Sequence, residues 1–275
     1  MNTNADVNTS QSLAVHSARL LHPQAPTKAP TFAYPGGKAR LASTIIKYVP
    51  QHGQVFADVF AGRGNVTFKV MVTPGIDYET YWSNDCRTAP FFHALLSDGN
   101  NIVVPERSRE EYHRQKANYP SPTSLLLEPM LTYSGAGYWH GGFRVTTGGP
   151  KRESYETTLR TAHELLAIHR PWITDWDYKK VLSQLGQDSF AFLDPPYLNA
   201  NVTAYKPSDL DHREMVSLLL TAKYRWILCE YDNALYTEAF GQPFWRRDMQ
   251  ICMTTRYKAD KAVRRIGTEC MWRNF

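Results

Sequence analysis

The sequence of 275 residues lacks the features of secreted, membrane-spanning and metal-clustering proteins. Its four cysteines never approach a C-x-x-C spacing, so we expect buried thiols and neither a disulfide framework nor a metal site. No apolar run reaches the roughly 18 residues that span a bilayer. The first residues also lack the basic and apolar regions of a secretory signal. We therefore expect a cytoplasmic protein without a membrane partner.

The composition is that of a folded protein. Apolar residues make up 43% and aromatic residues 13%, and the 17 prolines are spread thinly, which excludes collagen-like, coiled-coil and wholly disordered classes. A chain of 275 residues is long for one compact domain and short for two. We therefore expect one core that carries an inserted subdomain, in a monomer, with a dimer left open.

The formal net charge of +5 is unevenly distributed along the chain. Residues 1–50 hold five basic side chains against one acid, and residues 241–275 hold eight against three. Acid collects in residues 51–100, with five acids against three bases, and in residues 171–240, with ten against six. If these two segments converge, they form an acidic site for a cationic small ligand within a basic surface that suits a polyanion. Ordinary surface scatter is the alternative.

The order of the predicted elements indicates the fold class. Residues 1–30 are polar and end with three prolines, which predicts a flexible arm. Strand and helix patterns alternate over 31–100 and again over 171–275. This alternation predicts an α/β core with a doubly wound, mostly parallel sheet and an antiparallel last strand. Between 101 and 170 polar helices and a glycine-rich aromatic stretch predict an insertion, which the family resemblance described below implies to be a target-recognition subdomain of the catalytic core. We expect a closing hairpin with strands at 250–257 and 264–275.

A glycine turn, Gly62-Arg63-Gly64, follows a predicted strand and opens a helix, so its backbone amides can approach a ligand closely. Asp85 follows at the end of the next strand, where a carboxylate can hold both hydroxyls of a ribose. The two features predict an adenosine-containing ligand, and a tight turn without a ligand is the alternative. Thr67 replaces the third glycine of the dinucleotide fingerprint, and Asp58 lies near the turn. A carboxylate there favours a sulfonium or an ammonium over a pyrophosphate.

The segment Asp194-Pro195-Pro196-Tyr197 ends another predicted strand. Its prolines fix two φ angles and remove two N–H donors, and Pro195 holds Asp194 in an extended conformation. The turn therefore offers a carboxylate, an unpaired carbonyl and an aromatic ring. These groups match the two protons of an exocyclic amino group and the flat face of its base. A strand end with a capping Asp and a packing Tyr is the alternative.

Three motifs, in this order, resemble those of the Dam-like adenine-specific DNA methyltransferases: Tyr34-Pro35-Gly36-Gly37-Lys38, Ala57–Gly64, and the Asp-Pro-Pro-Tyr segment. Weaker similarities follow at Gly142-Phe143-Arg144-Val145 with Gly148 and Gly149, at Asp177-Tyr178, and at Thr268–Trp272. The resemblance extends over residues 31–275. The chain departs from the family pattern at Arg144, where Asn is usual, and at Val59, where Pro is common.

This resemblance implies a Rossmann-like methyltransferase core, S-adenosylmethionine as the cofactor and double-stranded DNA as the partner, in the cytosol of a prokaryotic or phage-infected cell. It implies either a restriction-modification enzyme or a solitary methylase. The catalytic residues that would hold a flipped adenine are Asp194, Pro195 and Tyr197. The implied cofactor site comprises Tyr34, Gly37, Lys38, Asp58, Phe60, Gly62, Gly64, Asp85, Asp177 and Asp194.

The chemistry of adenine predicts direct methyl transfer. The adenine amino group is a poor nucleophile because its lone pair is delocalised into the ring. Acceptance of its two protons by Asp194 and by the Pro195 carbonyl would raise the electron density opposite the sulfonium methyl group, which favours in-line attack. The sequence has no Pro-Cys pair to act as the nucleophile of a ring-carbon cytosine methyltransferase.

Extruding the base costs a few kcal/mol, and we expect the insertion and the closing hairpin to offset this energy. The candidate nucleic-acid contacts are aromatic or basic: Tyr138, Trp139, His140, Arg144, Lys206, Arg256, Lys258, Lys261, Arg264 and Arg265. Packing inside the insertion is the alternative for the aromatic residues, and a solvated charge is the alternative for the basic ones.

Four other functions remain open at this point. Amino-methylation of cytosine in DNA uses the same motifs, although that group more often has Ser at the position of Asp194. An RNA or protein-amide methyltransferase would recognise a similar planar group. A non-catalytic DNA-binding protein and a nicotinamide oxidoreductase are disfavoured, the first by the intact motifs and the second by Thr67.

Overall fold

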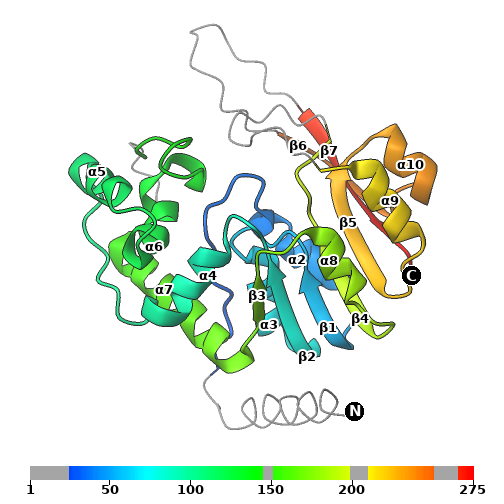
Figure 1. The fold of residues 1–275 in the computed structure, drawn as a ribbon, viewed down its shortest axis with the longest axis horizontal. Helices are drawn as coiled ribbons and strands as arrows, with labels where there is room; N and C mark the ends of the chain where they lie inside the picture. The colour runs from blue at the N-terminus through cyan, green and yellow to red at the C-terminus, as the bar shows by residue number, and fades with distance from the viewer. Residues whose placement is uncertain (1–24, 145–150, 199–209, 251–265) are drawn as a thin grey trace, which may run out of the picture.

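A computed structural model of the chain describes residues 25–144, 151–198, 210–250 and 266–275 (Figure 1). The strands are β1 (His52–Asp58), β2 (Asp77–Asn84), β3 (Trp172–Thr174), β4 (Ser189–Leu193), β5 (Arg225–Tyr231), β6 (Trp245–Gln250) and β7 (Ile266–Arg273). The helices are α2 (Ala42–Ile45), α3 (Asn65–Val72), α4 (Ala89–Asp98), α5 (Arg109–Ala117), α6 (Pro122–Leu131), α7 (Arg152–His169), α8 (Tyr178–Ser183), α9 (His212–Leu220) and α10 (Ala234–Phe240). Short 3-10 turns are η1 (Lys38–Arg40), η2 (Ile46–Tyr48) and η3 (Tyr133–Gly135).

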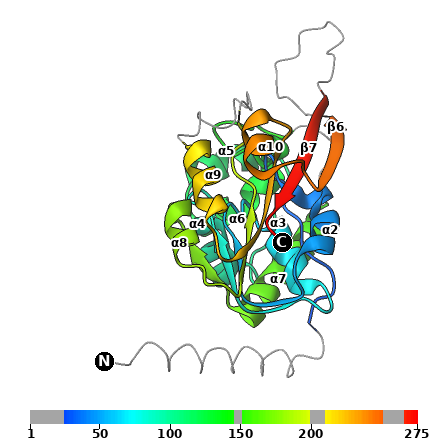
Figure 2. The ribbon, with the colours of Figure 1, turned by 90° about the vertical axis from the view of Figure 1, so that its right-hand side faces the viewer.

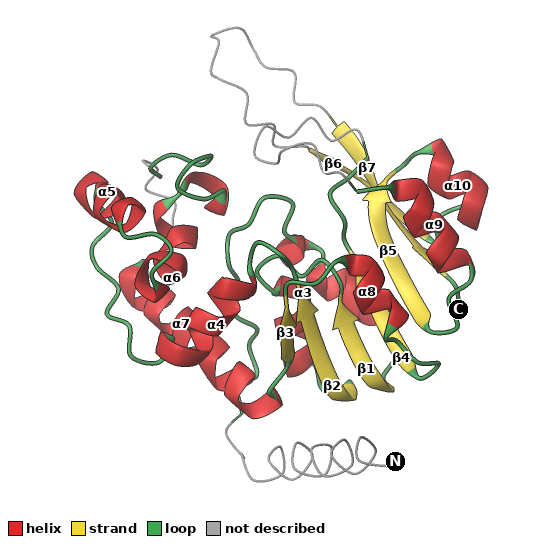
Figure 3. Ribbon diagram, viewed as in Figure 1, coloured by secondary structure: helices red, strands yellow, loops and turns green. Residues whose placement is uncertain are grey.

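The described strands form one sheet in the order β3-β2-β1-β4-β5-β7-β6 (Figure 3). Strands β1 to β5 pair in parallel, and β7 runs antiparallel to both β5 and β6. The chain order reverses at β1, whose two neighbours are β2 and β4. Ligands of such sheets bind at the carboxyl ends of the strands beside a reversal of this kind. The predicted fold class, a doubly wound and mostly parallel sheet with an antiparallel closing strand, is confirmed.

Helices cover both faces of the sheet because neighbouring strand residues point to opposite sides. Phe56 packs in a cluster with residues of α2, α3, α4 and α7, whereas the next residue, Ala57, packs with α8, α9 and α10. Figure 2 shows α8 and α9 on one side of the sheet and α2 on the other. Strand β4 is buried at all five positions, as a strand covered on both faces requires. The strands that end at the site are therefore central and rigid.

The segment 101–170, which we predict to be an insertion, contributes α5, α6, η3 and α7 beside the sheet (Figure 1). Helices α5 and α6 begin at serine caps, because Ser108 accepts a hydrogen bond from the backbone of Glu111 and Ser121 accepts one from Ser124. Helix α4 of the sheet layer contacts both α6 and α7. The hydrophobic core is thus continuous from the sheet into this segment.

Several predicted elements differ from the observed ones. The spacing of Leu41, Ile45, Ile46 and Val49 predicts one helix that ends at Pro50, but the structure breaks it into η1, α2 and η2. Helix α6, strand β3 and helix α10 have no counterpart among the elements predicted from the sequence. The first hairpin strand was predicted at 250–257, but β6 occupies Trp245–Gln250. Residues 251–257 lie outside the described part of the chain, as do most of the predicted N-terminal arm and the hairpin connection at 258–263.

Cys229 and Cys270 are buried as predicted. The same prediction was wrong for Cys86, which is exposed because it follows β2 in the turn before α4. Cys252 lies outside the described residues. Within the described residues, no helix is both long and apolar enough to cross a membrane.

Candidate active site

The glycine turn lies between β1 and α3, and its backbone geometry requires glycine. Gly62 has φ +53° and Gly64 has φ +72°, both in the left-handed region that glycine tolerates. A Cβ on Gly62 would lie 2.8 Å from the ring of Tyr34. The Tyr34–Lys38 motif therefore packs directly on the turn, and the missing side chain of Gly62 makes this contact possible.

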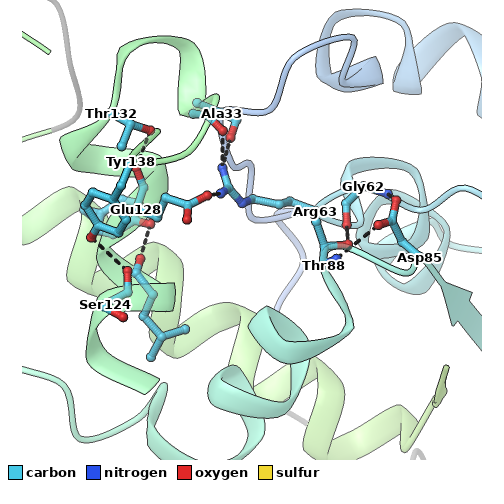
Figure 4. A network of polar contacts seen from close by, with 12 residues as sticks. Ala33, Gly62, Arg63, Asp85, Thr88, Ser124, Glu128, Thr132 and Tyr138 are labelled. Carbon is cyan, nitrogen blue, oxygen red and sulfur yellow. Dashed lines mark hydrogen bonds and ion pairs between the residues drawn. The ribbon is translucent and has the colours of Figure 1, made fainter. Parts of the chain in front are cut away.

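Asp85 stabilises the turn from the end of β2 (Figure 4). Its Oδ2 accepts a hydrogen bond from the Gly62 backbone N–H at 3.1 Å, and its Oδ1 accepts from the N–H groups of Arg87 and Thr88 at 2.8 and 3.0 Å. The Thr88 hydroxyl donates to the Gly62 carbonyl. Burial raises the pKa of Asp85, and these backbone donors oppose that rise. Asp85 thus holds the backbone of Gly62 in place. The predicted contact of Asp85 with a ribose would be a second role.

Asp58, at the end of β1, is a buried carboxylate with one unsatisfied oxygen. Only 2% of the residue is exposed, and Oδ2 accepts a hydrogen bond from the Thr67 hydroxyl at 2.8 Å. Oδ1 is buried and has no partner among the described residues. Burial raises the pKa of Asp58 to about 7, the Thr67 hydrogen bond opposes this, and the charge of Asp194 raises it further. Such a group gains by contact with a cation.

Three further residues were predicted to contact the cofactor, and the structure places each of them. Asp177 caps α8, because its Oδ1 accepts a hydrogen bond from the Lys179 N–H at 2.8 Å. Phe60 packs against the ring of Tyr178, with 5.8 Å between ring centroids. Gly37 is exposed, and a Cβ there would lie 3.1 Å from the Tyr34 carbonyl oxygen.

Asp194 follows β4 directly, on the strand that pairs with β1. Asp58 is in register with Phe192, and the N–H of Val59 donates to the Phe192 carbonyl at 2.9 Å. The carboxylates of Asp58 and Asp194 therefore lie at the ends of adjacent strands. Asp194 Oδ1 lies 2.7 Å from Lys38 Nζ. Burial raises the pKa of Asp194 to about 6, and the charge of Lys38 opposes this rise.

Lys38 joins the first motif to the last strand. Its ammonium lies 3.3 Å from Glu269 Oε1 on β7 and 4.8 Å from the centroid of the Tyr197 ring. The Tyr197 hydroxyl donates a hydrogen bond to the same Glu269 oxygen. Burial acts to lower the pKa of Lys38, but the charges of Asp194 and Glu269 outweigh it and raise the pKa. Lys38 is therefore a fixed cation between two buried carboxylates.

A second buried acid supports the backbone that follows Tyr197. Glu230, on β5, is fully buried; its Oε2 accepts from the Leu198 N–H at 2.9 Å and its Oε1 accepts from the Tyr231 N–H at 2.8 Å. Burial raises the pKa of Glu230 to about 8. The Tyr197 ring packs edge-on against Tyr231, with 4.6 Å between centroids. The end of the Asp-Pro-Pro-Tyr segment is thus tied to β5.

The two acidic segments of the sequence converge at this edge of the sheet. Asp58 and Asp85 come from the first segment, and Asp194 and Glu230 come from the second. Asp85 follows β2, Asp58 ends β1 and Asp194 follows β4, and these three strands are neighbours in the sheet, so the three carboxylates lie at the same edge. Excess negative charge of this kind favours a cationic ligand.

The predicted DNA contacts fall into three groups. Tyr138 is 1% exposed, and its hydroxyl donates to the Ser124 carbonyl at 2.9 Å, so it packs inside the insertion and is not free to contact DNA (Figure 4). Trp139 is 60% exposed, His140 is exposed, and Arg144 is partly buried. The remaining candidates lie outside the described residues: Lys206, Arg256, Lys258, Lys261, Arg264 and Arg265.

Glu269, Glu230 and Arg63 were not predicted as site residues. The sequence carries only a weak signal for the two acids: Glu269 lies in the closing strand, and Glu230 lies one residue before the end of the buried strand β5. A charged residue is almost never fully buried without a partner. Within the described residues, no group of three or more His, Cys, Asp or Glu side chains is arranged to hold a metal ion.

Comparison with known proteins gives a family match for the part of this site that comes first in the sequence. The sequence model of the D12 class N6 adenine-specific DNA methyltransferase family matches residues 34–99. The resemblance to this family is confirmed. The D12-class match includes Tyr34, Lys38, the glycine turn and Asp85, and it ends before Asp194. This match supports methylation of adenine in DNA as the general activity.

Other comparisons add less to the D12-class match. A search of curated proteins found no match. Among solved structures, the rRNA methyltransferase aviRa from Streptomyces viridochromogenes is similar over 88% of this chain and 86% of its own, with 13% identity and a TM-score of 0.40.

Proposed function

We propose that this protein transfers a methyl group from S-adenosylmethionine to the exocyclic amino group of adenine within a specific sequence of double-stranded DNA. The observation that carries the proposal is the pair of buried carboxylates at the ends of β1 and β4. Asp58 has an unsatisfied oxygen, and Asp194 is held by Lys38. The D12-class match supports adenine in DNA as the target.

The residues at the glycine turn fit S-adenosylmethionine, which supplies an electrophilic methyl group on a sulfonium when bound. The free oxygen of Asp58 suits the ammonium of the amino-acid part of this cofactor. Gly62 and Gly64 allow the left-handed backbone of the turn, whose N–H groups could approach the ligand, while Tyr34 and Phe92 fill the space that their side chains would take. Phe60 and Asp177 would border the adenosine part, and Tyr34 would support the turn.

Asp194, the Pro195 carbonyl and Tyr197 would hold the extruded adenine. Asp194 and the carbonyl accept the two amino protons, and the Tyr197 ring lies against the base. As the N–C bond to the methyl group forms and the S–C bond breaks, the amine loses one proton to the Asp194 carboxylate and then to water. S-adenosylhomocysteine and N6-methyladenine are the products. Glu269 orients Tyr197 through its hydroxyl and shares the charge of Lys38.

The substrate class is tested by incubating the protein with S-adenosylmethionine carrying a labelled methyl group and, separately, duplex DNA, RNA and a protein extract. Each product is digested and the labelled component identified. We expect labelled N6-methyladenine in DNA alone. Label in a cytosine amino group, in RNA or in protein without DNA would contradict the assignment and identify the alternative.

A further inference from the structure

The backbone of Arg63 is part of the glycine turn, whereas its side chain contacts the insertion. It lies between Gly62 and Gly64, yet only 3% of it is exposed. Figure 4 shows its side chain extending from the turn, where Gly62, Thr88 and Asp85 lie, to Glu128 on α6. The guanidinium carbon lies 5.5 Å from the Tyr34 ring centroid and 5.4 Å from that of Phe91.

Three separate segments accept hydrogen bonds from this one guanidinium. Nη1 donates to the Ala33 carbonyl, just before the Tyr34–Lys38 motif, and to the Gly135 carbonyl in η3 at 3.0 Å. Nη2 forms a buried ion pair with Glu128, whose side chain is 13% exposed. Arginine presents its donors in a planar, rigid fork, so these acceptors have fixed positions relative to one another.

The contact at Gly135 is too tight for any side chain. A Cβ there would lie 2.0 Å from the Ala33 carbonyl oxygen and 2.7 Å from Arg63 Nη1. Gly135 lies near the start of the loop between Thr132 and Phe143, whose ends are joined by a β-bridge. This loop presents Trp139, one of the most exposed aromatic residues among those described. Arg63 therefore fixes the base of the loop that carries candidate DNA contacts.

We infer that Arg63 is a positioning residue that couples the cofactor turn to the loop 132–143, so that cofactor and DNA each strengthen the binding of the other. The inference rests on the proposed function. A ligand that orders the turn fixes the backbone of Arg63, and the fork transmits this order to Gly135 and Glu128. Thermodynamic linkage requires the reverse effect to have the same magnitude.

The test measures the dissociation constant of S-adenosylhomocysteine, which cannot donate a methyl group, with and without saturating duplex DNA that the wild-type protein methylates. The ratio of the two constants is the coupling factor. We expect about 5-fold or more for the wild type, within the usual range of allosteric coupling. In Arg63→Met combined with Glu128→Leu, both buried charges are replaced by apolar groups of similar size, so no unpaired charge remains. We expect the factor to fall to about one in this variant.

Arg63→Lys is the second variant. It keeps the charge beside Glu128, but a single ammonium cannot reproduce the planar fork, so its coupling factor should fall as well. The matched control is Lys179→Gln with Glu214→Gln, which removes an exposed ion pair of 3.2 Å between α8 and α9, on the other face of the sheet. This control should keep the wild-type factor, and circular dichroism verifies folding of every variant.

The outcomes of this test distinguish a failure of the coupling role from a failure of the proposed function. A wild-type protein that binds S-adenosylhomocysteine and DNA independently, or variants at Arg63 that keep the wild-type coupling factor, would overturn the coupling role and leave the proposed function intact. A wild-type protein that binds neither ligand would overturn the proposed function itself, and the inference with it.

Discussion

The buried ionisable side chains differ in how far hydrogen bonds or opposite charges offset the cost of their burial. Lys38 faces two carboxylates, Asp194 and Glu269, so each of these acids retains a nearby cation. Asp58 has only the Thr67 hydroxyl on one oxygen and nothing on the other among the described residues. Asp58 is therefore a residue at which a cationic ligand would relieve the cost of burial.

Asp58→Asn should stabilise the protein without ligand while weakening cofactor binding. Burial raises the pKa of Asp58 from 3.8 to about 7. A raised carboxyl pKa destabilises the fold progressively as pH rises from about 4 to 7, and asparagine removes this effect. We expect a gain of roughly 2–4 kcal/mol in the free energy of unfolding at pH 8, which shrinks as pH falls toward 4. Denaturant unfolding at several pH values measures it.

The matched control for this prediction is Asp188→Asn, an exposed carboxylate in the turn before β4. It should leave the free energy of unfolding nearly unchanged at every pH. The dissociation constant of S-adenosylmethionine should rise at least about tenfold in Asp58→Asn, the loss expected for a buried charge-assisted contact. Equal affinity in the two variants would remove Asp58 from the cofactor site.

The part that a single residue plays in the site can be predicted from the sequence when the residue lies in a local motif. It cannot be predicted when the part depends on a contact with a residue far away in the chain. Asp194 and Tyr197 lie in one short motif, so the chemistry of that motif and its resemblance to a known family predict a common role for them, which stays a prediction. Glu269 meets Lys38, which lies 231 positions earlier in the chain, only when the sheet has formed. Tyr138 looked like a contact residue, yet its hydroxyl is satisfied inside the insertion.

At the scale of elements, the site depends on the turns at the carboxyl ends of parallel strands. The strand β1 ends in the glycine turn, and β4 ends in the two prolines, which leave their backbone rigid. Both strands are central in the sheet, so their ends are fixed by neighbours on each side. The order β2-β1-β4 thus brings the two motifs together, although Asp194 follows Gly64 by 130 positions.

Gly62→Ala tests the turn, with Gly75→Ala as the matched control. Both glycines have positive φ, +53° and +80°, so each substitution costs about 1–2 kcal/mol in backbone strain. A Cβ on Gly75 would meet no atom within 4 Å, whereas a Cβ on Gly62 would meet the Tyr34 ring at 2.8 Å. Gly62→Ala should therefore lower the free energy of unfolding more and weaken S-adenosylmethionine binding, as measured by denaturation and calorimetry. Equal effects of the two substitutions would contradict the packing of Tyr34 on the turn.

The elements with strong periodicity were predictable, and the short or proline-containing ones were not. Strand β3 has three residues, too few to show an alternating pattern. Helix α6 contains Pro122 at its first turn, where proline is tolerated, and Pro129 in its interior, where it usually ends a helix. Both prolines resemble loop signals in the sequence, but the tertiary contacts of α6 with α4 and α5 override them.

For the molecule as a whole, charge is separated between the site and the rest of the chain. The acids of two sequence segments meet at one edge of the sheet, whereas the net charge of the chain is +5. A positive net charge favours a polyanionic partner such as the proposed DNA substrate, and the acidic edge of the sheet favours a cationic ligand. The division into arm, core and target-recognition insertion remains a prediction, and the shared core between α4, α6 and α7 shows why the boundary is not sharp.

Replacing Lys258, Lys261, Arg264 and Arg265 together with Gln should weaken DNA binding about equally for all sequences. In a plot of log K against log salt, each lost phosphate contact lowers the magnitude of the slope by about 0.9. The magnitude should therefore fall by about 3–4 in the fourfold variant. The control is Lys47→Gln with Lys223→Gln, two exposed bases at the amino edge of the sheet. Binding measured over a salt series should show an unchanged slope for the control. An unchanged slope for the fourfold variant would exclude these residues as phosphate contacts.

The most direct measurement is the single-turnover rate of methyl transfer to adenine in duplex DNA by the wild type and by Asp194→Ala, at saturating S-adenosylmethionine. Lys38 keeps Glu269 as a partner in this variant, so the fold should tolerate the change. We predict a rate lower by about 10²–10⁴-fold, with the cofactor dissociation constant changed only a few-fold. Equal rates in the two proteins would contradict the role of Asp194 in accepting the amino protons.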